Sequence, residues 1–464
     1  MLSRRNLLVG AGAATLLAGG ASVLHLSRLR RDIRAPLLYA YGIYEYANRL
    51  QVISGQVDRP GLVNAEDARR QHPDWEGGPL LNREIHMRNL TDHTRREITT
   101  ANNDTLYTSA VLDISKGPVE VTVPDVVERY LSVAFMDPFN DQIAYIGTRA
   151  TNGQGGRFWV IGPKQTPDIP DEVTPIFATA NDLWMLGRVF VAGHSDLEAA
   201  RAVQSQIKAR PVDPANLGSG FITESSDTPD AATFLALTNE VLGRSPITGH
   251  AERAAQFSDF GIQPGNLDAF AALSAAKQFA WGRGIEQVEN EVMKVTREER
   301  AKTIGWTKPP KILGNYGTND EVRAGVTIIG FGALTTEEAM YFGGVTDSNG
   351  DPLDGTKSYK MVIPASGIPV SAFWSLSMYE EDELQRLYFY ENELNRYSIN
   401  SSSEDLTYQP DGSIVLALQP TRPDDPSLVW MPTPNGPFQC VFRTYLPEAS
   451  IMSGDWQPPQ IMPV

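Results

Sequence analysis

The sequence contains a single cysteine, Cys440, among its 464 residues, so no disulfide can form within the chain. Packing alone must therefore hold the fold together. In the alternating segment 438–442, Cys440 shares one face with Phe438 and Phe442. This pattern predicts a buried, inert thiol rather than a nucleophile.

Positive charge is also scarce. The chain has 40 lysines and arginines against 56 aspartates and glutamates, and its formal net charge at pH 7 is −16. Several of the arginines lie in the first 34 residues, so the remainder is more acidic still. Such a surface repels nucleic acid and anionic lipid, and we expect neither to be a partner of the body of the protein.

Histidine is rare, with six residues and no pair at i, i+4 spacing. His72, His86 and His93 could converge on a metal, but surface or capping roles are commoner for histidines in a polar loop. The segment 347–351 begins like a calcium loop but lacks the required glycine and glutamate at the sixth and twelfth positions. We therefore expect no metal and no cofactor.

Local motifs of the common enzyme classes are missing as well. The chain has no Walker A loop, no Gly-x-Ser-x-Gly elbow and no His-Glu-x-x-His pair. The sequence therefore does not identify a reaction class.

The N-terminus, in contrast, carries a recognisable signal. Ser3-Arg4-Arg5-Asn6-Leu7-Leu8 resembles the twin-arginine export motif, and a weakly apolar stretch rich in Ala and Gly follows it up to residue 26. We expect a periplasmic or secreted protein. Cleavage near Gly19-Gly20-Ala21 and retention as an uncleaved membrane anchor are both open, because a helix of about twenty residues just spans the hydrocarbon core.

Beyond the leader, hydrophobic periodicity changes from β to α and back to β. This order predicts a mixed, β-rich fold in which two β-sandwich-like domains have a helical domain or layer between them. Strands are expected at residues 119–123, 130–135, 142–147, 157–161, 183–192, 359–363, 370–379, 414–418, 429–431 and 438–445. Helices are expected at 33–54, 196–209, 228–242, 267–300 and 321–342, the last broken by Gly330 and Gly332.

The same pattern gives expected domain boundaries. Residues 1–34 form the signal or anchor segment, 35–195 an N-terminal helix plus β-domain, 196–343 a helical region, and 344–464 a C-terminal β-sandwich.

Two long stretches resemble bacterial families that are known only by number. The first contains Asn102-Asn103-Asp104-Thr105-Leu106-Tyr107, Arg129-Tyr130, Met136-Asp137 and Gly147-Thr148-Arg149, and resembles the domain-of-unknown-function family 1254. The second contains Phe373-Trp374-Ser375-Leu376-Ser377-Met378-Tyr379, Asn395-Arg396-Tyr397-Ser398-Ile399 and Gly454-Asp455-Trp456-Gln457-Pro458-Pro459, and resembles its usual partner, family 1214. The resemblance implies paired β-sandwich domains with helices between them, often in exported proteins, and no general activity. One departure is Thr100-Ala101, where many relatives have Arg-Pro before the first motif.

The candidate site residues come from three polar or aromatic clusters. Asp104 is a candidate general base at a strand entry, although Asp and Asn commonly cap backbone groups there. Arg396 is a candidate clamp for an anion, with a structural ion pair as an equal alternative. Trp374 or Phe373 faces the core, and the other could line a groove. The candidate catalytic residues are Asp104 and Arg396, and the candidate ligand-binding residues are Asn103, Thr105, Tyr107, Trp374, Tyr379 and Tyr397.

These observations favour one functional hypothesis over two others. We expect the protein to bind, or process by hydrolysis, a small polar or glycan-like ligand in a cleft between the β-domains, with Asp104 and Arg396 on the walls of that cleft. A non-catalytic structural or interaction protein of the cell envelope is the alternative, and a metal-dependent enzyme is less favoured. A homo-oligomer is compatible with any of them.

The export signal can be tested directly. Replacing Arg4 and Arg5 together by lysine should keep the protein in the cytoplasm, because twin-arginine recognition needs the guanidinium pair whereas general secretion needs only positive charge. Cell fractionation followed by immunoblotting measures the outcome. Unchanged export of the double variant would show that the leader uses another route.

Overall fold

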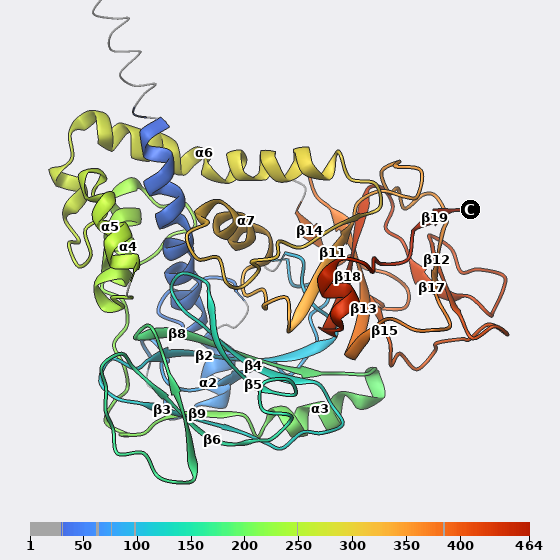
Figure 1. Cartoon of the computed structure of the whole chain (residues 1–464), viewed down its shortest axis with the longest axis horizontal. Coiled ribbons are helices and arrows are strands. Elements are labelled where there is room, and N and C mark those ends of the chain that lie inside the picture. Colours follow the sequence, from blue (N-terminus) through green and yellow to red (C-terminus); the bar gives the residue numbers. More distant parts are fainter. Residues whose placement is uncertain are drawn as a thin grey trace, which may run out of the picture.

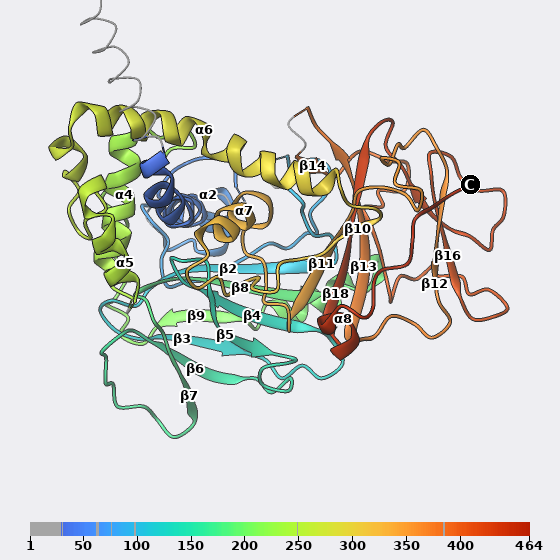
Figure 2. The same ribbon diagram turned by 45° about the horizontal axis from the view of Figure 1, so that its top comes forward.

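The computed structural model describes residues 29, 31–61, 65–75, 77–96, 99–247, 249–383 and 386–464. Most of the predicted leader therefore lies outside the described residues. Two β-sandwiches lie beside each other, and a group of helices packs across them (Figures 1 and 2). Within the described part of the chain, no helix has both the length and the apolar character of a membrane span. The expected fold class, two β-rich domains with helices between them, is confirmed.

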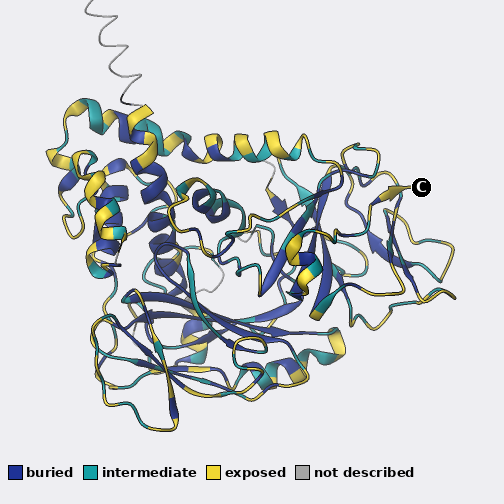
Figure 3. Ribbon diagram, in the orientation of Figure 1, coloured by how far each residue is buried: buried dark blue, intermediate teal, exposed yellow. Residues whose placement is uncertain are grey.

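The N-terminal sandwich packs a five-stranded sheet against a four-stranded one. In the alternating strand β3 (Val119–Val123) the three valines are buried, as expected for a half-buried strand. The central strand β8 (Asp182–Phe190) is buried at every position, because protein covers both faces of its sheet (Figure 3). The order of the first sheet is β1 (Ile85–His86), β2 (Thr105–Asp113), β8, β4 (Leu131–Met136) and β5 (Gln142–Gly147). The order of the second is β7 (Val173–Phe177), β6 (Gly156–Ile161), β3 and β9 (Lys208–Pro211).

The helices α4, α5, α6 and α7 lie around one long buried helix at residues 31–53, close to the expected 33–54. Tyr39, Tyr44 and Tyr46 of this helix are fully buried, and it is largely buried along its length in Figure 3. The helix α6, which has 26 residues, runs from the α4 side of this group of helices to the C-terminal sandwich (Figure 1). The helices are α2 (Ala65–Gln71), α3 (Leu197–Gln204), α4 (Ala231–Arg244), α5 (His250–Gln256), α6 (Ala275–Arg300), α7 (Asp320–Gly330) and α8 (Ala449–Ser453), with 3-10 turns at His194–Asp196, Ser258–Phe260 and Ala269–Ala272.

The C-terminal sandwich has its own apolar core, which includes Trp374, Phe442 and Cys440. Its larger sheet has the order β10 (Trp306–Thr307), β11 (Ala339–Gly344), β18 (Phe438–Pro447), β13 (Val370–Glu381) and β14 (Leu387–Tyr388), with β15 (Ser398–Asn400) also paired to β13. Its smaller sheet has the order β17 (Val429–Pro432), β16 (Ile414–Gln419), β12 (Tyr359–Ile363) and β19 (Met462–Pro463).

The structure moves two expected boundaries. The expected helix at 196–209 ends at Gln204, and β9 then pairs with β3, so the N-terminal sandwich extends past residue 195. The expected helix at 321–342 ends at Gly330, and β11 pairs with β18 in the C-terminal sheet. In both places a strand of four or six residues follows a helix after a short connection, and its apolar residues fit either the helical or the strand period.

The two sandwiches meet where the β2-β8-β4 face of one sheet contacts the β11-β18-β13 face of the other, and we call this contact the seam. Phe373 joins the two sides, because its ring lies 4.0 Å from the ring of Phe190 and 4.0 Å from that of Tyr445, measured between centroids. Tyr130 packs at 5.2 Å from Tyr445. These aromatic contacts fix the two sheets against each other.

The buried thiol provides a test of this packing. Cys440 is fully buried in the C-terminal core beside Met378 and Gly344, and burial raises the pKa of its thiol. We expect Cys440→Ala to lower the free energy of unfolding by about 1 kcal/mol, the cost of a small cavity. Urea denaturation measures this change. A loss several times larger, or a loss of ligand binding with the fold intact, would contradict an inert packing role.

Candidate functional site

The seam presents two matching rows of polar side chains. In each row an arginine on the central strand has a tyrosine as its neighbour on one adjacent strand and a serine on the other. Side chains alternate along a strand, so these rows share the faces that carry the aromatic contacts of the seam. The first row is Tyr107, Arg188 and Ser132, and the second is Tyr341, Arg443 and Ser375.

Arg188 is the member of these rows whose charge has the fewest partners among the described residues. Its residue is only 6% exposed, and Nη2 donates a hydrogen bond of 2.8 Å to the carbonyl oxygen of Gly332. Nη1 has no hydrogen-bond partner among the described residues. The guanidinium carbon lies 5.4 Å from the centre of the Tyr107 ring. A buried charge without a counter-charge is costly, so this guanidinium requires an explanation.

Arg443, in contrast, is well supplied with acceptors. Its guanidinium donates to Ser377 Oγ at 2.5 Å and to the Tyr379 hydroxyl at 2.7 Å. It also donates to the carbonyl oxygens of Thr100 at 3.1 Å and Ala101 at 3.2 Å. Arg443 therefore ties the loop before β2 to the C-terminal sheet.

Asp104 lies at the end of that loop and has no exposed surface. Its Oδ1 accepts hydrogen bonds from Ser398 Oγ at 2.8 Å and from Asn400 Nδ2 at 3.4 Å, both from the C-terminal sandwich. Its Oδ2 has no partner within the described chain, and the same holds for the hydroxyls of Thr105, Ser132 and Ser375. Several polar atoms of the seam are thus buried without a protein partner, which is uncommon.

The tyrosines of the seam are held in the neutral form. Burial raises the pKa of Tyr341 and of Tyr445. Burial also raises the pKa of Tyr130, and the Glu338 carboxylate, which accepts the Tyr130 hydroxyl at 2.9 Å, raises it further. Burial raises the pKa of Tyr379 although the neighbouring Arg443 acts in the opposite direction. These phenols can therefore serve as hydrogen-bond donors at any ordinary pH.

Two tyrosines of the seam are partly exposed to solvent. Tyr107 and Tyr341 keep part of their surface exposed, while Arg188, Asp104 and Tyr445 around them are buried. The charges of Arg188 and Arg443 both act on Tyr341, which places all three in one electrostatic environment. The seam therefore combines a buried cation with two tyrosines that are partly exposed.

Four of the residues singled out from the sequence lie at the seam: Asp104, Thr105, Tyr107 and Tyr379. Two others have structural contacts. Asn103 donates through Nδ2 to the carbonyl oxygen of Thr91 at 2.6 Å. Trp374 faces the core of the C-terminal sandwich and stacks on Phe442 with ring centroids 5.6 Å apart, so Phe373 is the residue that faces the seam.

Arg396 and Tyr397 lie instead beside a surface groove. Arg396 donates to the carbonyl oxygen of Trp430 at 2.6 Å and pairs with Asp405. The Tyr397 hydroxyl lies 2.6 Å from His93 Nδ1. Asp104 has no exposed surface and shares no hydrogen-bond partner with Arg396, so the structure does not place the two on the walls of one open cleft. A catalytic role for either residue stays a prediction.

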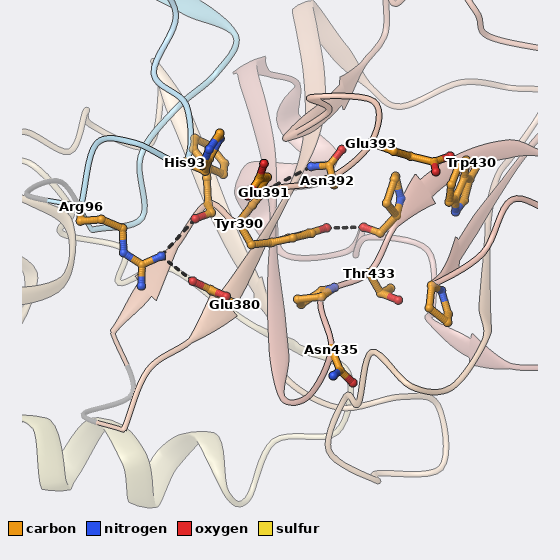
Figure 4. Close-up of a pocket in the computed structure, with 14 residues that line it drawn as sticks. His93, Arg96, Glu380, Tyr390, Glu391, Asn392, Glu393, Trp430, Thr433 and Asn435 are labelled. Atoms are coloured by element: carbon orange, nitrogen blue, oxygen red, sulfur yellow. Dashed lines mark hydrogen bonds and ion pairs between the residues drawn. The ribbon is translucent and has the colours of Figure 1, made fainter.

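The groove has a volume of about 610 Å³, and His93 and Trp430 are among its lining residues (Figure 4). Figure 4 shows Arg96 pointing toward Glu380, with which it forms an ion pair. The Tyr390 hydroxyl is likewise engaged, by the carbonyl oxygen of Pro432. The groove is therefore roomy, but several of its polar groups already have partners.

Sequence reasoning missed Arg188 and Arg443. Each was hidden inside a segment read as an apolar strand, at 183–192 and 438–445. A single arginine in the middle of such a strand is itself a signal, because arginine is almost never buried unless it is paired. The expectation of no metal is not tested by the structure; among the described residues, no three His, Cys, Asp or Glu side chains group as metal ligands would.

Comparison with known proteins agrees with this architecture. No curated protein matches the chain. The crystal structure of the VPA0106 protein from Vibrio parahaemolyticus is similar, with a TM-score of 0.65, 23% sequence identity, and coverage of 95% of this chain and 100% of that one. A putative uncharacterized protein from Burkholderia cenocepacia matches with a TM-score of 0.44 and 13% identity, over 97% of this chain and 98% of that one.

Two family models also match, each to one β-domain. Residues 81–211 match the model described as "Protein of unknown function (DUF1254)", which covers the strands of the N-terminal sandwich. Residues 338–449 match the model described as "Protein of unknown function (DUF1214)", which covers most of the C-terminal sandwich. The chain thus carries a DUF1254 segment followed by a DUF1214 segment, with the seam formed between the two.

Proposed function

We propose that the protein binds a small polar ligand that carries a carboxylate, such as a sugar acid, at the seam between the two sandwiches. The buried guanidinium of Arg188, with an unpartnered Nη1, is the observation that carries this proposal. Guanidinium binds carboxylate through paired, charge-assisted hydrogen bonds, which are the strongest that neutral pH allows a protein to offer.

The charges of the seam favour an anion. Arg188 and Arg443 contribute two positive charges, and Asp104 contributes one carboxylate. The nearby Glu338 is already engaged by Arg149 at 2.6 Å and by the Tyr130 hydroxyl. A ligand with one negative charge would balance the remaining guanidinium and remove the cost of burying it alone.

The polar oxygens of the seam that lack partners in the described part of the protein favour a ligand with hydroxyls. The hydroxyls of Ser132, Ser375 and Thr105 and the Oδ2 atom of Asp104 lack protein partners among the described residues. Serine and threonine hydroxyls both donate and accept, and a carboxylate only accepts. The ring faces of Tyr107 and Tyr341 add apolar surface of the kind on which sugar rings stack. A sugar acid has a carboxylate for the guanidinium, hydroxyls for the unpartnered hydroxyls and a ring that can pack on the tyrosines.

Export through the predicted leader would place this site in the periplasm or outside the cell. Asp104 is the carboxylate positioned for acid–base chemistry if the bound ligand is also hydrolysed. The alternative is that the seam is purely architectural and that the protein has a structural role in the cell envelope.

Arg188→Met tests the proposal. Arg188 makes one hydrogen bond to the protein, so its replacement by an apolar side chain should change the free energy of unfolding by no more than about 1 kcal/mol. A sugar acid such as glucuronate or galacturonate, at about a hundred times its dissociation constant, should stabilise the native protein by about 2.7 kcal/mol and should have no effect on the variant. Thermal and chemical unfolding with and without the acid measure both quantities.

Two controls separate binding from architecture. Glucose and galactose, which lack the carboxylate, should not stabilise the protein. Arg244 is a matched arginine outside the seam, paired with Asp182 at 2.6 Å, and Arg244→Met should destabilise the fold by about 3–5 kcal/mol while ligand stabilisation persists. If Arg188→Met destabilises the fold as strongly as Arg244→Met, and neither acid stabilises the native protein, Arg188 is architectural and the proposal fails.

A further inference from the structure

A second hollow, on the N-terminal sandwich, is separate from the seam and from the groove of Figure 4. It has a volume of about 350 Å³ and lies between the end of α2, the edge strand β1, the end of α3 and β9. Its charged lining residues are Arg88, Lys208, Arg210 and Glu84.

The lining of this hollow is cationic in a strongly acidic protein. Lys208 and Arg210 stand at its rim, with side chains 46% and 48% exposed. Both pair with Glu84, which also accepts the backbone N–H of Ala209 at 2.9 Å. Glu84 is the one carboxylate on the described lining, so the hollow keeps an excess of positive charge although the chain as a whole carries −16.

Arg88 supplies a guanidinium without a carboxylate partner on this lining. Its Nη1 donates to neutral oxygens, at 2.8 Å to Ser205 Oγ, 3.0 Å to Gln204 Oε1 and 3.2 Å to the carbonyl oxygen of Arg201. These contacts hold one edge of the guanidinium in place. A guanidinium fixed in this way is suited to bind an oxyanion with little loss of side-chain entropy.

His86 adds an independent sign of a ligand. It lines the hollow, is only 8% exposed, and its Nδ1 lies 3.0 Å from Thr108 Oγ1. Its Nε2 has no hydrogen-bond partner among the described residues. Burial lowers the pKa of His86 to about 4, so the ring is neutral at ordinary pH and can offer Nε2 for a hydrogen bond without adding charge.

We propose that this hollow binds a tetrahedral oxyanion, a phosphate or sulfate group, held by Arg88, Lys208 and Arg210 with His86 Nε2 as a further hydrogen-bond partner. Several converging donors suit an oxyanion with three or four oxygens better than a single carboxylate. Glu84 pairs with both Lys208 and Arg210, and its negative charge reduces the repulsion between the cationic side chains of the hollow. The group can arrive as a free ion or as a monoester of a small molecule.

Calorimetric titration of the purified chain tests the proposal, with inorganic phosphate, sulfate and glycerol 1-phosphate as probes and sodium chloride held constant. We expect saturable binding of phosphate, weakened about tenfold by Arg88→Gln and by Lys208→Gln, the loss expected for one charge-assisted hydrogen bond. Lys294→Gln makes the same charge change on α6, where the side chain is 73% exposed, and should leave binding unchanged. Tighter binding of glycerol 1-phosphate than of phosphate would identify an ester as the ligand.

Histidine NMR spectra of the unchanged chain give a second readout of binding. The chain has six histidines, so the ring signals of His86 can be assigned with His86→Gln and followed by NMR during the phosphate titration. They should shift with the same saturation curve as the calorimetric signal. The proposal is overturned if none of the three probes binds, if Lys294→Gln weakens binding as much as Lys208→Gln, or if the His86 signals do not move.

Discussion

The burial of the Arg188 guanidinium between two sheets is the constraint on which the rest of the seam depends. A sandwich that packs on another through apolar faces needs no such group, and an unpaired charge in that position destabilises the contact. Here Tyr107 and Ser132 flank it on the neighbouring strands, and Tyr130, Tyr341 and Tyr445 also act on its charge. A buried polar network stabilises a structure only when its members have hydrogen-bond partners, and the atoms of the seam that lack one within the described chain are the basis of our proposal of a ligand.

The apolar part of the seam makes that polar network possible. Phe373 bridges Phe190 and Tyr445, and the two sheets are therefore held at a fixed separation whether or not the polar groups have partners. Arg443 has a complementary role, since its bonds to the carbonyl oxygens of Thr100 and Ala101 fix the loop that carries Asp104. Both carbonyls belong to the two residues that come just before the Asn102-Asn103-Asp104 motif.

Most of the fold could be predicted from local pattern, because a half-buried strand such as β3 records in its alternation which face meets the core. The exceptions have a common cause. β9 and β11 each follow a helix after a short connection, and pairing with β3 and β18, partners that are distant in sequence, decides that they are strands. Phe373 and Trp374 show the same limit, since alternation assigns them to opposite faces but does not say which face is the core and which is the seam.

The candidate site was harder to predict, because its residues are the few polar ones in or beside strands that are otherwise apolar. Asp104, Thr105 and Tyr107 stood out as a polar run, and the seam contains all three. Arg396 stood out for the same reason, but it is bound to Trp430 and Asp405 on the surface, because a polar run in a loop does not distinguish solvent from an interface. Arg188 is a stronger indication of a site than Arg396. A guanidinium in a buried apolar strand is costly unless another group balances its charge. A search for lone arginines within buried strands would have found both Arg188 and Arg443, and only the pairing of β8 with β2 and β4 would have shown what lies beside them.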